Sequence, residues 1–263
     1  DDVFSTYLYA GTSSSMTITN GIDLSGEGGM VWVKNRSLTK DHLLFDTERG
    51  VQKGLRPNTA NAEVTASQWL TAFNNNGFSV GSDSLSDSGS DYVSWTFRKQ
   101  RKFFDIVTYT GNGTAGHAVS HNLGSVPGMI LIKNLTGESW LVYHRGIGNT
   151  KSLTLNSTAA EDTSIAYFNN TDPTSTHFTL GTVGSGGVNN ENGVSYVAYL
   201  FAHNEQEFGE NSDEAIIYCD SFTTTSTWGN FKEEIGFEPQ WLLVKRTDSN
   251  DNWIMLDMMR GVA

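Results

Sequence analysis

Three arginine–glycine pairs are the most regular polar feature of this chain: Arg49-Gly50, Arg145-Gly146 and Arg260-Gly261. A guanidinium binds carboxylates and phosphates through a planar fork of donors, so recurring arginines could bind an anion or an acidic sugar. In two copies an aspartate stands three residues earlier, at Asp46 and Asp257. A local Arg–Asp pair, followed by a glycine in the left-handed region, accounts for the same residues. We favour this structural interpretation and keep Arg49, Arg145 and Arg260 as candidate ligand or partner contacts.

A second polar feature is the acidic loop "GSDSLSDSGSD", which places Asp83, Asp87 and Asp91 four residues apart. Calcium takes six to eight oxygen ligands that converge on one point, and clustered aspartates can supply some of them. A solvated acidic loop has the same composition and needs no such convergence. We therefore predict no metal site and retain these three aspartates only as calcium candidates.

Residues arranged for catalysis are not evident. His117 and His121 are four apart, but "GHAVSHNLG" lacks helical character and no glutamate follows His117 as a zinc hydrolase motif requires. Cys219 is the single cysteine and lies in the apolar run "AIIYCDSF", which is typical of a buried strand residue. We predict that the protein is not an enzyme, with no catalytic residue and no cofactor. Paired carboxylates for glycoside cleavage cannot be recognised from sequence, because their separation is a three-dimensional quantity.

The amino-acid composition argues against several classes of binding partner. The chain has 263 residues, a formal net charge of −12 and a sequence pI of about 4.8. An acidic surface repels phosphate, so we expect neither nucleic acid nor an anionic membrane surface as a partner. No apolar stretch approaches the roughly 20 residues of a membrane span, so membrane insertion is not expected either. Many Gly, Ser, Thr and Asn residues disfavour long helices and suit short strands joined by turns.

One strand–turn–strand pattern occurs three times in the sequence. Lys34, Lys133 and Lys245 close the apolar runs "MVWVK", "MILIK" and "WLLVK", spaced by 99 and 112 residues. After each lysine a polar turn leads into "LLFDTERG", "WLVYHRG" or "WIMLDMMRG". We expect each lysine to lay its stem along the sheet and to keep its charge in water.

The second half of the unit also recurs, because "SDYVSWTFRK" at 90–99 matches "VSYVAYLFAH" at 194–203, with Trp95 in the place of Tyr199. We therefore predict three units: a first β-sandwich at 1–102, a second at 103–213, and the start of a third, incomplete one at 214–263. Short strands at regular spacing predict an all-β fold of tandem antiparallel β-sandwiches, of jelly-roll or lectin-like type. Residues 59–72 are the best helical candidate, with a strand pair as the alternative.

Seven tryptophans are unusual in a chain of this length, and most lie in strand patterns. Alternation places Trp32 on the face opposite Val31 and Val33. An outward-facing Trp32 could stack on a sugar ring or enter a partner's pocket. Burial between neighbouring units is the alternative for the same residue.

The quoted lines carry a family resemblance. "DVFSTYLYAGTSSSMTITNGIDLSGEGGMVWVKNRS", "LLFDTERG", "NNNGFSVGSDS" and "YVSWTFRK" resemble the repeated β-rich domain of tail-fibre and appendage-type virion proteins from tailed phages of marine cyanobacteria. Later repeats of that family open with a Gly-x-x-Pro line ending in Lys-Asn. Here this line has the residues Gly124, Pro127, Lys133 and Asn134, and again Gly236, Pro239 and Lys245, with Arg246 in place of the asparagine.

The resemblance implies a location on the exterior of a phage particle, other virion proteins as partners, and a homo-oligomer, for which a trimer is typical. It carries over no catalytic residue. We therefore expect a non-enzymatic structural protein (a tail fibre, knob or capsid appendage) that serves assembly and host adhesion. The alternatives are a lectin-like module that binds a host surface glycan and, third, a surface-polysaccharide depolymerase.

Overall fold

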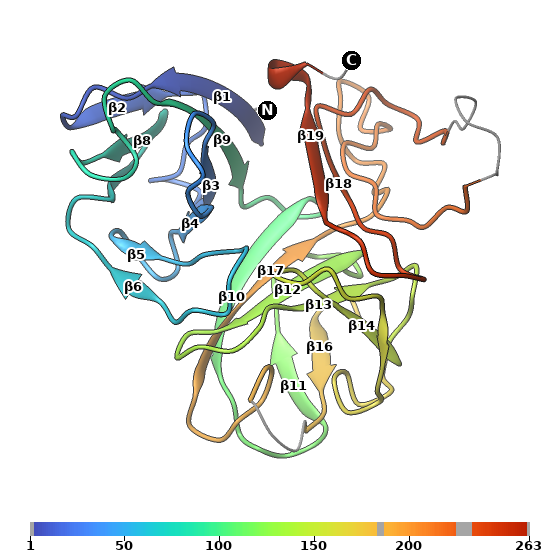
Figure 1. Ribbon diagram of the computed structural model, residues 1–263. Coiled ribbons are helices and arrows are strands. Elements are labelled where there is room, and N and C mark those ends of the chain that lie inside the picture. Colours follow the sequence, from blue (N-terminus) through green and yellow to red (C-terminus); the bar gives the residue numbers. More distant parts are fainter. Residues whose placement is uncertain (1–2, 183–186, 225–232, 262–263) are drawn as a thin grey trace.

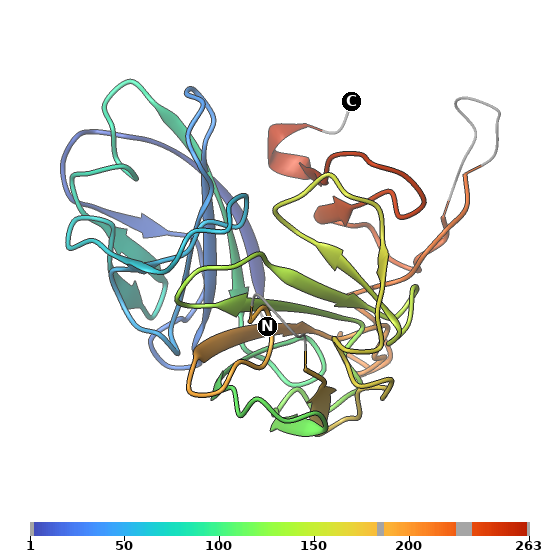
Figure 2. The same ribbon diagram turned by 60° about the horizontal axis from the view of Figure 1, so that its bottom comes forward.

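The computed structural model describes residues 3–182, 187–224 and 233–261, and the protein is all-β with antiparallel sheets, which confirms the predicted fold class. Within these ranges the single helical element is a 3-10 turn, η1 (Met258–Arg260). The described residues form no helix that could span a membrane. Figures 1 and 2 show three lobes that follow one another in sequence order, coloured blue to teal, green to gold, and orange to red.

The first lobe is a two-layer sandwich. Its larger sheet has the order β1-β9-β3-β4, formed by β1 (Phe4–Ala10), β9 (Asp91–Arg98), β3 (Gly29–Asn35) and β4 (Leu43–Asp46). A smaller sheet has the order β2-β8-β7, formed by β2 (Met16–Thr19), β8 (Gly77–Val80) and β7 (Leu70–Asn74). Ile18, Leu70 and Phe78 of the smaller sheet bury Val31 and Phe45 of the larger one. A short pair, β5 (Lys53–Gly54) and β6 (Val64–Thr65), lies beside them.

The second lobe has the same strand order in its larger sheet. That order is β10-β17-β12-β13-β14-β15, and the first four strands take the places of β1, β9, β3 and β4. The strands are β10 (Phe104–Thr110), β17 (Ser195–Phe201), β12 (Met129–Asn134), β13 (Leu141–His144), β14 (Lys151–Thr154) and β15 (Asp162–Thr163). β11 (His117–Ser120) pairs with β16 (His177–Leu180) as the cover, and Phe178 packs against Ile130 and Tyr143. The predicted unit boundaries at 102 and 213 stay a prediction that this strand order supports.

The described part of the third lobe contains a hairpin, β18 (Trp241–Val244) with β19 (Ile254–Asp257), followed by η1. Its register pairs Trp241 with Asp257, as Met30 pairs with Asp46 in the first lobe. The hairpin therefore corresponds to β3–β4 and to β12–β13.

The predicted helix over 59–72 is wrong, and the alternative of two strands is what forms, as β6 and β7. Gln52 explains the choice, because its amide donates to Leu70 O at 2.9 Å and its carbonyl accepts from Ala66 N at 2.9 Å. These long-range backbone bonds outweigh the weak local preference of the segment for a helix.

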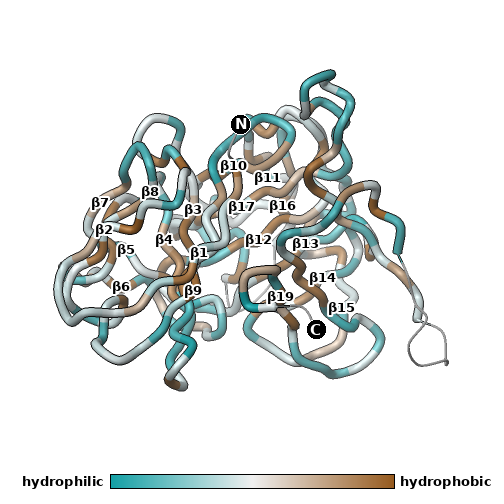
Figure 3. Tube along the Cα trace, turned by 90° about the horizontal axis from the view of Figure 1, so that it is seen from above, coloured by the Kyte–Doolittle hydropathy of each residue, from teal (hydrophilic) through white to brown (hydrophobic). Residues whose placement is uncertain are grey.

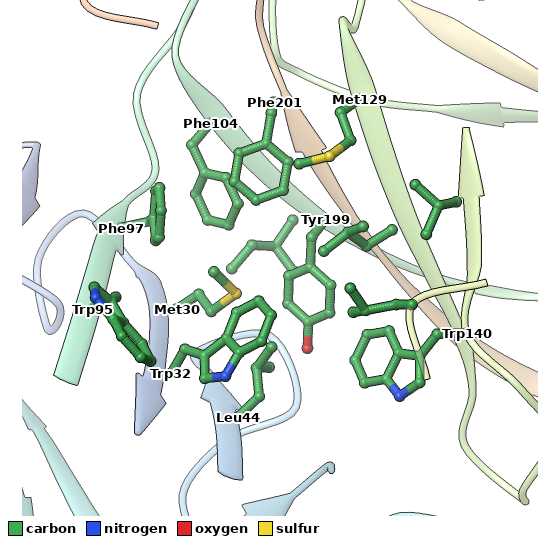
Figure 4. Packing of buried hydrophobic residues seen from close by; sticks show 14 of the residues in the cluster. Met30, Trp32, Leu44, Trp95, Phe97, Phe104, Met129, Trp140, Tyr199 and Phe201 are labelled. Carbon is green, nitrogen blue, oxygen red and sulfur yellow. The ribbon is translucent and has the colours of Figure 1, made fainter. Parts of the chain in front are cut away.

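One apolar core joins the three lobes. Alternation along β9 points Val93, Trp95 and Phe97 into this shared core, whereas Tyr92 points into the interior of the first sandwich. The second lobe contributes its β10, β12 and β17 side chains, and the third contributes partly buried residues of its hairpin. Figure 4 shows Trp32, Trp95, Phe97, Tyr199, Phe201 and Trp140 meeting there from different lobes. Apolar strands such as β3 and β9 run through the interior in Figure 3.

Candidate functional site: the junctions between the three lobes

Arg49 lies at the junction of the first and second lobes. Its Nε donates to Asp46 Oδ2 at 2.6 Å and its Nη1 to Glu63 Oε2 at 2.9 Å, while Tyr199 OH donates to the same Asp46 oxygen at 2.6 Å. The Arg49 side chain is 3% exposed. Burial opposes its charge, yet Tyr199, Asp46 and Glu63 together raise the Arg49 pKa above its ordinary value. All its donors are directed at protein atoms, so Arg49 stabilises the junction and is not presented to a ligand.

Arg260 repeats this arrangement where the third lobe meets the first. Arg260 pairs with Asp257 at 2.5 Å, and Trp95 Nε1 donates to Asp257 Oδ2 at 3.0 Å. The guanidinium carbon also lies 5.0 Å from the centre of the Trp95 ring, within the range of a cation–π contact. Gly261 has a φ of 85°. The local Arg–Asp pair with a left-handed glycine is therefore present here as the structural interpretation predicted.

Arg145 does not correspond to Arg49, so the alignment of the second arginine–glycine pair is wrong. The register places His144 opposite Met129, in the position that Asp46 takes opposite Met30. The left-handed glycine of this turn is Gly148, with φ 79°, and its amide donates to His144 O. The Arg145 side chain is instead 40% exposed.

The contacts of Arg145 are with residues far along the chain. Its Nη1 lies 3.1 Å from Asp220 Oδ2 and 2.8 Å from His203 Nε2. Of the three predicted arginines it is the one with substantial exposure, so it is the one that remains accessible as a contact for a partner.

The expectation that the repeated lysines keep their charge in water is wrong for Lys133. Lys133 is fully buried, and its Nζ donates to Ala60 O at 3.2 Å and to Gly137 O and Glu138 O at 2.5 Å. Lys34 and Lys245 likewise donate to backbone carbonyls of their own turns. The ammonium group thus stabilises the hairpin turn through hydrogen bonds to its carbonyls. Burial lowers the Lys133 pKa to about 8.

Two junctions use matching contacts. In the first, Lys133 Nζ donates to Ala60 O, Glu63 N to Leu135 O, and Trp140 Nε1 to Arg56 O. The contacts at the second junction are Lys245 Nζ to Thr158 O, Glu161 N to Thr247 O, and Trp253 Nε1 to Thr154 O. The same strand–turn–strand element therefore docks onto the same loop of the preceding lobe each time.

At each of two junctions an aromatic side chain of one lobe donates a hydrogen bond to an aspartate of another lobe. The second lobe's Tyr199 donates to the first lobe's Asp46, and the first lobe's Trp95 donates to the third lobe's Asp257. Trp95 and Tyr199 occupy corresponding places on β9 and β17, since they face Trp32 and Leu131. The three lobes consequently close a ring around the shared core. The sequence alignment already paired Trp95 with Tyr199, but it contained no signal that either one donates across a junction.

Trp32 lies inside this ring and not on the surface. It is buried, its Nε1 donates to His42 Nδ1 at 2.9 Å, and its ring meets Trp95 edge-on. Burial between neighbouring lobes, the alternative given for this residue, is what the structure shows. None of the six described tryptophans is exposed, and Trp228 lies outside the described residues.

Two histidines at the junctions titrate at low pH. Burial lowers the pKa of His42 and of His144 to about 4 each, below the ordinary value of 6.5. Between these values the unfolded chain binds more protons than the folded one, so stability rises with pH in that window. We expect the free energy of unfolding to fall as pH drops from about 6.5 to 4, by on the order of 2 kcal/mol for each histidine.

Urea unfolding at a series of pH values measures this dependence. A His42→Gln variant should lose its share of the slope between pH 4 and 6.5 while retaining an acceptor for Trp32. An unchanged slope in that variant would contradict the assignment to His42.

The aspartates of the acidic loop do not gather around one point. Asp87 Oδ2 pairs with Lys40 Nζ at 2.7 Å, and Asp83 Oδ1 accepts from Ser84 Oγ at 3.1 Å. Over the ranges that the structure covers, no group of three or more His, Cys, Asp or Glu side chains is placed to hold a metal. We expect the melting temperature to be the same in millimolar calcium and in chelator. A rise with calcium that Asp87→Asn abolishes would contradict this.

A pocket of about 320 Å³ opens in the first lobe beside the β3–β4 turn. Its polar lining includes Asn35, Lys40, Asp41 and Arg56, and Trp69 and Tyr92 form apolar walls. Arg56 covers the Trp69 ring at 5.5 Å from the ring centre. The pocket is therefore lined by side chains of both charges and by two aromatic rings, and Arg56 covers the Trp69 ring.

Asn35 has a buried amide donor at the wall of this pocket, beside Tyr92. Its Oδ1 accepts from Ser37 N and Leu38 N, but its buried Nδ2 has no hydrogen-bond partner among the described residues. In the second lobe the corresponding Asn134 Nδ2 donates to Gly187 O at 2.8 Å. The second lobe thus places a backbone carbonyl, Gly187 O, beside this amide, and the described part of the first lobe has no equivalent carbonyl bonded to Asn35 Nδ2.

The fold and the junctions define an all-β protein in which repeated polar residues hold antiparallel sheets around a common core. Residues 1–263 match the model of a family described as "Domain of unknown function (DUF7483)", and the chain belongs to that family. No curated protein and no solved structure matches the chain.

Proposed function

We propose that this chain is a non-enzymatic structural part of the exterior of a phage virion, a tail fibre, knob or capsid appendage that serves assembly and adhesion to the host surface. Its partners are other virion proteins and further copies of itself, in a homo-oligomer for which a trimer is plausible. The virion location rests on the resemblance of the quoted sequence lines to appendage-type virion proteins.

One structural observation carries the mechanical part of the proposal: three lobes closed into a ring around one core. Charged residues of the ring pair with one another at its junctions. They are Asp46, Arg49 and Glu63 at one junction, and Asp257 and Arg260 at another. A surface appendage must keep its shape under shear, and buried ion pairs with defined partners restrict the lobes to one arrangement. Repeated modules also suit adhesion, where many weak contacts add to a strong attachment.

Antibodies raised against the 263-residue chain test the proposal on particles of a phage that encodes it. We expect gold-labelled antibody on the tail or capsid exterior of intact particles, and we expect the antibody to slow adsorption to host cells. Labelling that appears only after particles are disrupted would contradict the exterior location. Release of reducing sugar from host polysaccharide, abolished by one carboxylate substitution, would instead establish the depolymerase.

The pocket at Asn35 favours a second candidate function, binding of a surface glycan. A sugar hydroxyl that reached the buried Asn35 Nδ2 would give it an acceptor, and Asp41 and Arg56 offer an acceptor and donors beside it. Recognition would depend on these hydrogen bonds and not on stacking, because the described tryptophans are not exposed.

A glycan array followed by titration tests this second candidate. Asn35→Asp keeps the acceptor that holds the turn and removes the donor, so it should abolish binding. The matched change Asn134→Asp in the second lobe should leave binding intact. Equal binding by both variants, or no binding by the unaltered chain, would leave the structural function alone.

A further inference from the structure

A strap of six residues, 216–221, lies against the chain that follows β17. Asn204 N donates to Ile217 O at 2.8 Å, and the side chain of Ile217 packs against the shared core. Cys219 is buried, and its thiol donates to Ala202 O at 3.3 Å. The strap therefore closes one side of the core, and Cys219 is covered while the strap stays in place.

The imidazole of His203 connects the second lobe to this strap. Its Nδ1 accepts from Cys219 N at 3.1 Å, and its Nε2 lies 2.8 Å from Arg145 Nη1. Both neighbours are donors, because a backbone amide nitrogen and a guanidinium offer no lone pair. A neutral imidazole has one unprotonated nitrogen that can accept, whereas an imidazolium has none. The hydrogen bond to the strap therefore requires a neutral His203.

The surroundings of His203 also oppose its protonation. Ionisable side chains of three segments surround the ring, and they are His144 and Arg145 at the end of β13, Glu205 after β17, and Tyr218 and Asp220 on the strap. Burial and the charge of Arg145 lower the His203 pKa from its ordinary value of 6.5, and the two carboxylates act in the opposite direction. Asp220 already pairs with Arg145 at 3.1 Å. A proton on His203 would consequently add a second cation beside Arg145.

The first lobe has a permanent charge in the equivalent position. Lys99 and His203 each stand two residues after the phenylalanine that faces the methionine of β3 or β12. Lys99 Nζ pairs with Glu48 Oε1 at 2.6 Å and lies 3.5 Å from Asp105 Oδ1. The first lobe thus places a fixed cation between two carboxylates. The second lobe places a titratable base against an arginine instead.

We propose that His203 is a pH-dependent switch, which holds the strap closed when neutral and releases residues 216–221 when protonated. The inference does not depend on the virion assignment. Protonation removes the acceptor of Cys219 N and places like charges side by side at Arg145, and both changes favour the open strap. A base whose pKa is lower in the closed state stabilises that state above pH 6.5 and loses this contribution as pH falls. Release therefore begins below pH 6.5.

Cys219 can report on the strap, because it is the single cysteine of the chain and is buried. The test compares the unaltered chain with His203→Asn, whose side-chain oxygen accepts from Cys219 N at any pH. A pyridyl disulfide, which reacts with thiols in acid, should label both chains at equal rates at pH 7.5. At pH 5 the unaltered chain should react about three- to tenfold faster than the variant, the range for loss of one hydrogen bond.

The comparison with His203→Asn separates the switch from the general loss of stability in acid. His42 and His144 destabilise both chains as pH falls, so their contribution cancels in the ratio of the two rates. The matched change His177→Asn alters a histidine of the second lobe that lies outside this cluster, and it should behave as the unaltered chain does. Equal labelling of the unaltered chain and His203→Asn at pH 5 would overturn the proposal.

Hydrogen exchange locates the release within the chain. At pH 5, exchange at 216–221 should be about three- to tenfold faster in the unaltered chain than in His203→Asn. Exchange in β3 and β12 should be the same in the two chains. An equal difference in all three segments would show that the substitution changes the stability of the whole fold, and would overturn a local switch.

A permanent charge at the same position should mimic protonation. His203→Lys offers Cys219 N no acceptor and places an ammonium group beside Arg145, so Cys219 should be labelled quickly at both pH values. Exchange in β3 and β12 at pH 7.5 shows whether this variant is folded. Slow labelling of a folded His203→Lys chain would contradict the switch. If the variant does not fold, the comparison with His203→Asn decides by itself.

Discussion

Replacing Asp46 by alanine is expected to lower the free energy of unfolding by about 3–5 kcal/mol, the usual cost of breaking a buried ion pair from one side. The change leaves Glu63 as the one carboxylate paired with the Arg49 guanidinium and removes the acceptor of the Tyr199 hydroxyl. Both groups lie at the junction of the first two lobes. Urea unfolding with intrinsic fluorescence measures the loss.

Two variants make the Asp46 prediction specific. Asp248→Ala removes one partner of the exposed Arg246–Asp248 pair and should leave stability unchanged. The double change Asp46→Leu with Arg49→Met should recover part of the loss, because apolar residues of similar volume replace a buried pair at little cost, while the Tyr199 hydroxyl still lacks its acceptor. A destabilisation by Asp46→Ala no larger than that of Asp248→Ala would show that the ion pair does not hold the junction.

Replacing Trp95 by alanine is expected to cost about 3–5 kcal/mol, because it leaves a large cavity in a packed core. Trp95 is almost completely buried, faces Trp32, stacks on His42 and donates to Asp257. Its loss frees the third lobe from the first, so hydrogen exchange in β19 should accelerate more than exchange in β12.

The matched change Trp95→Phe separates the indole nitrogen from the ring. It keeps an aromatic ring in the core and removes the donor to Asp257, so the expected loss is about 1–3 kcal/mol. Uniform acceleration of exchange across all three lobes in Trp95→Ala would contradict a local role at the junction.

Much of the fold could be predicted from local pattern. Alternation separated Trp32 from Val31 and Val33 correctly, because the side chains of a strand point to opposite faces by geometry alone. Lys34, Lys133 and Lys245 aligned correctly because each closes an apolar run of the same length in the sequence. The helix predicted over 59–72 was wrong because the local preference of that segment is weak. Backbone hydrogen bonds with Gln52 determine its conformation instead.

The polar site residues were harder to place. Arg145 and Gly146 look like Arg49 and Gly50 in sequence, but the turn that follows β13 puts its left-handed glycine at Gly148. Only the strand register shows that His144 replaces Asp46. A motif of two residues carries too little information to detect such a shift.

The sequence by itself determined the all-β class, the recurring strand–turn–strand element and the faces of its strands, because these follow from the composition and from a period of two. Tertiary structure alone decided that the lobes share one core, that Tyr199 and Trp95 donate across junctions, and that Lys133 is buried. Those facts depend on where residues far apart in the chain meet. The energy of each such contact comes from removing both partners from water, which no local pattern records.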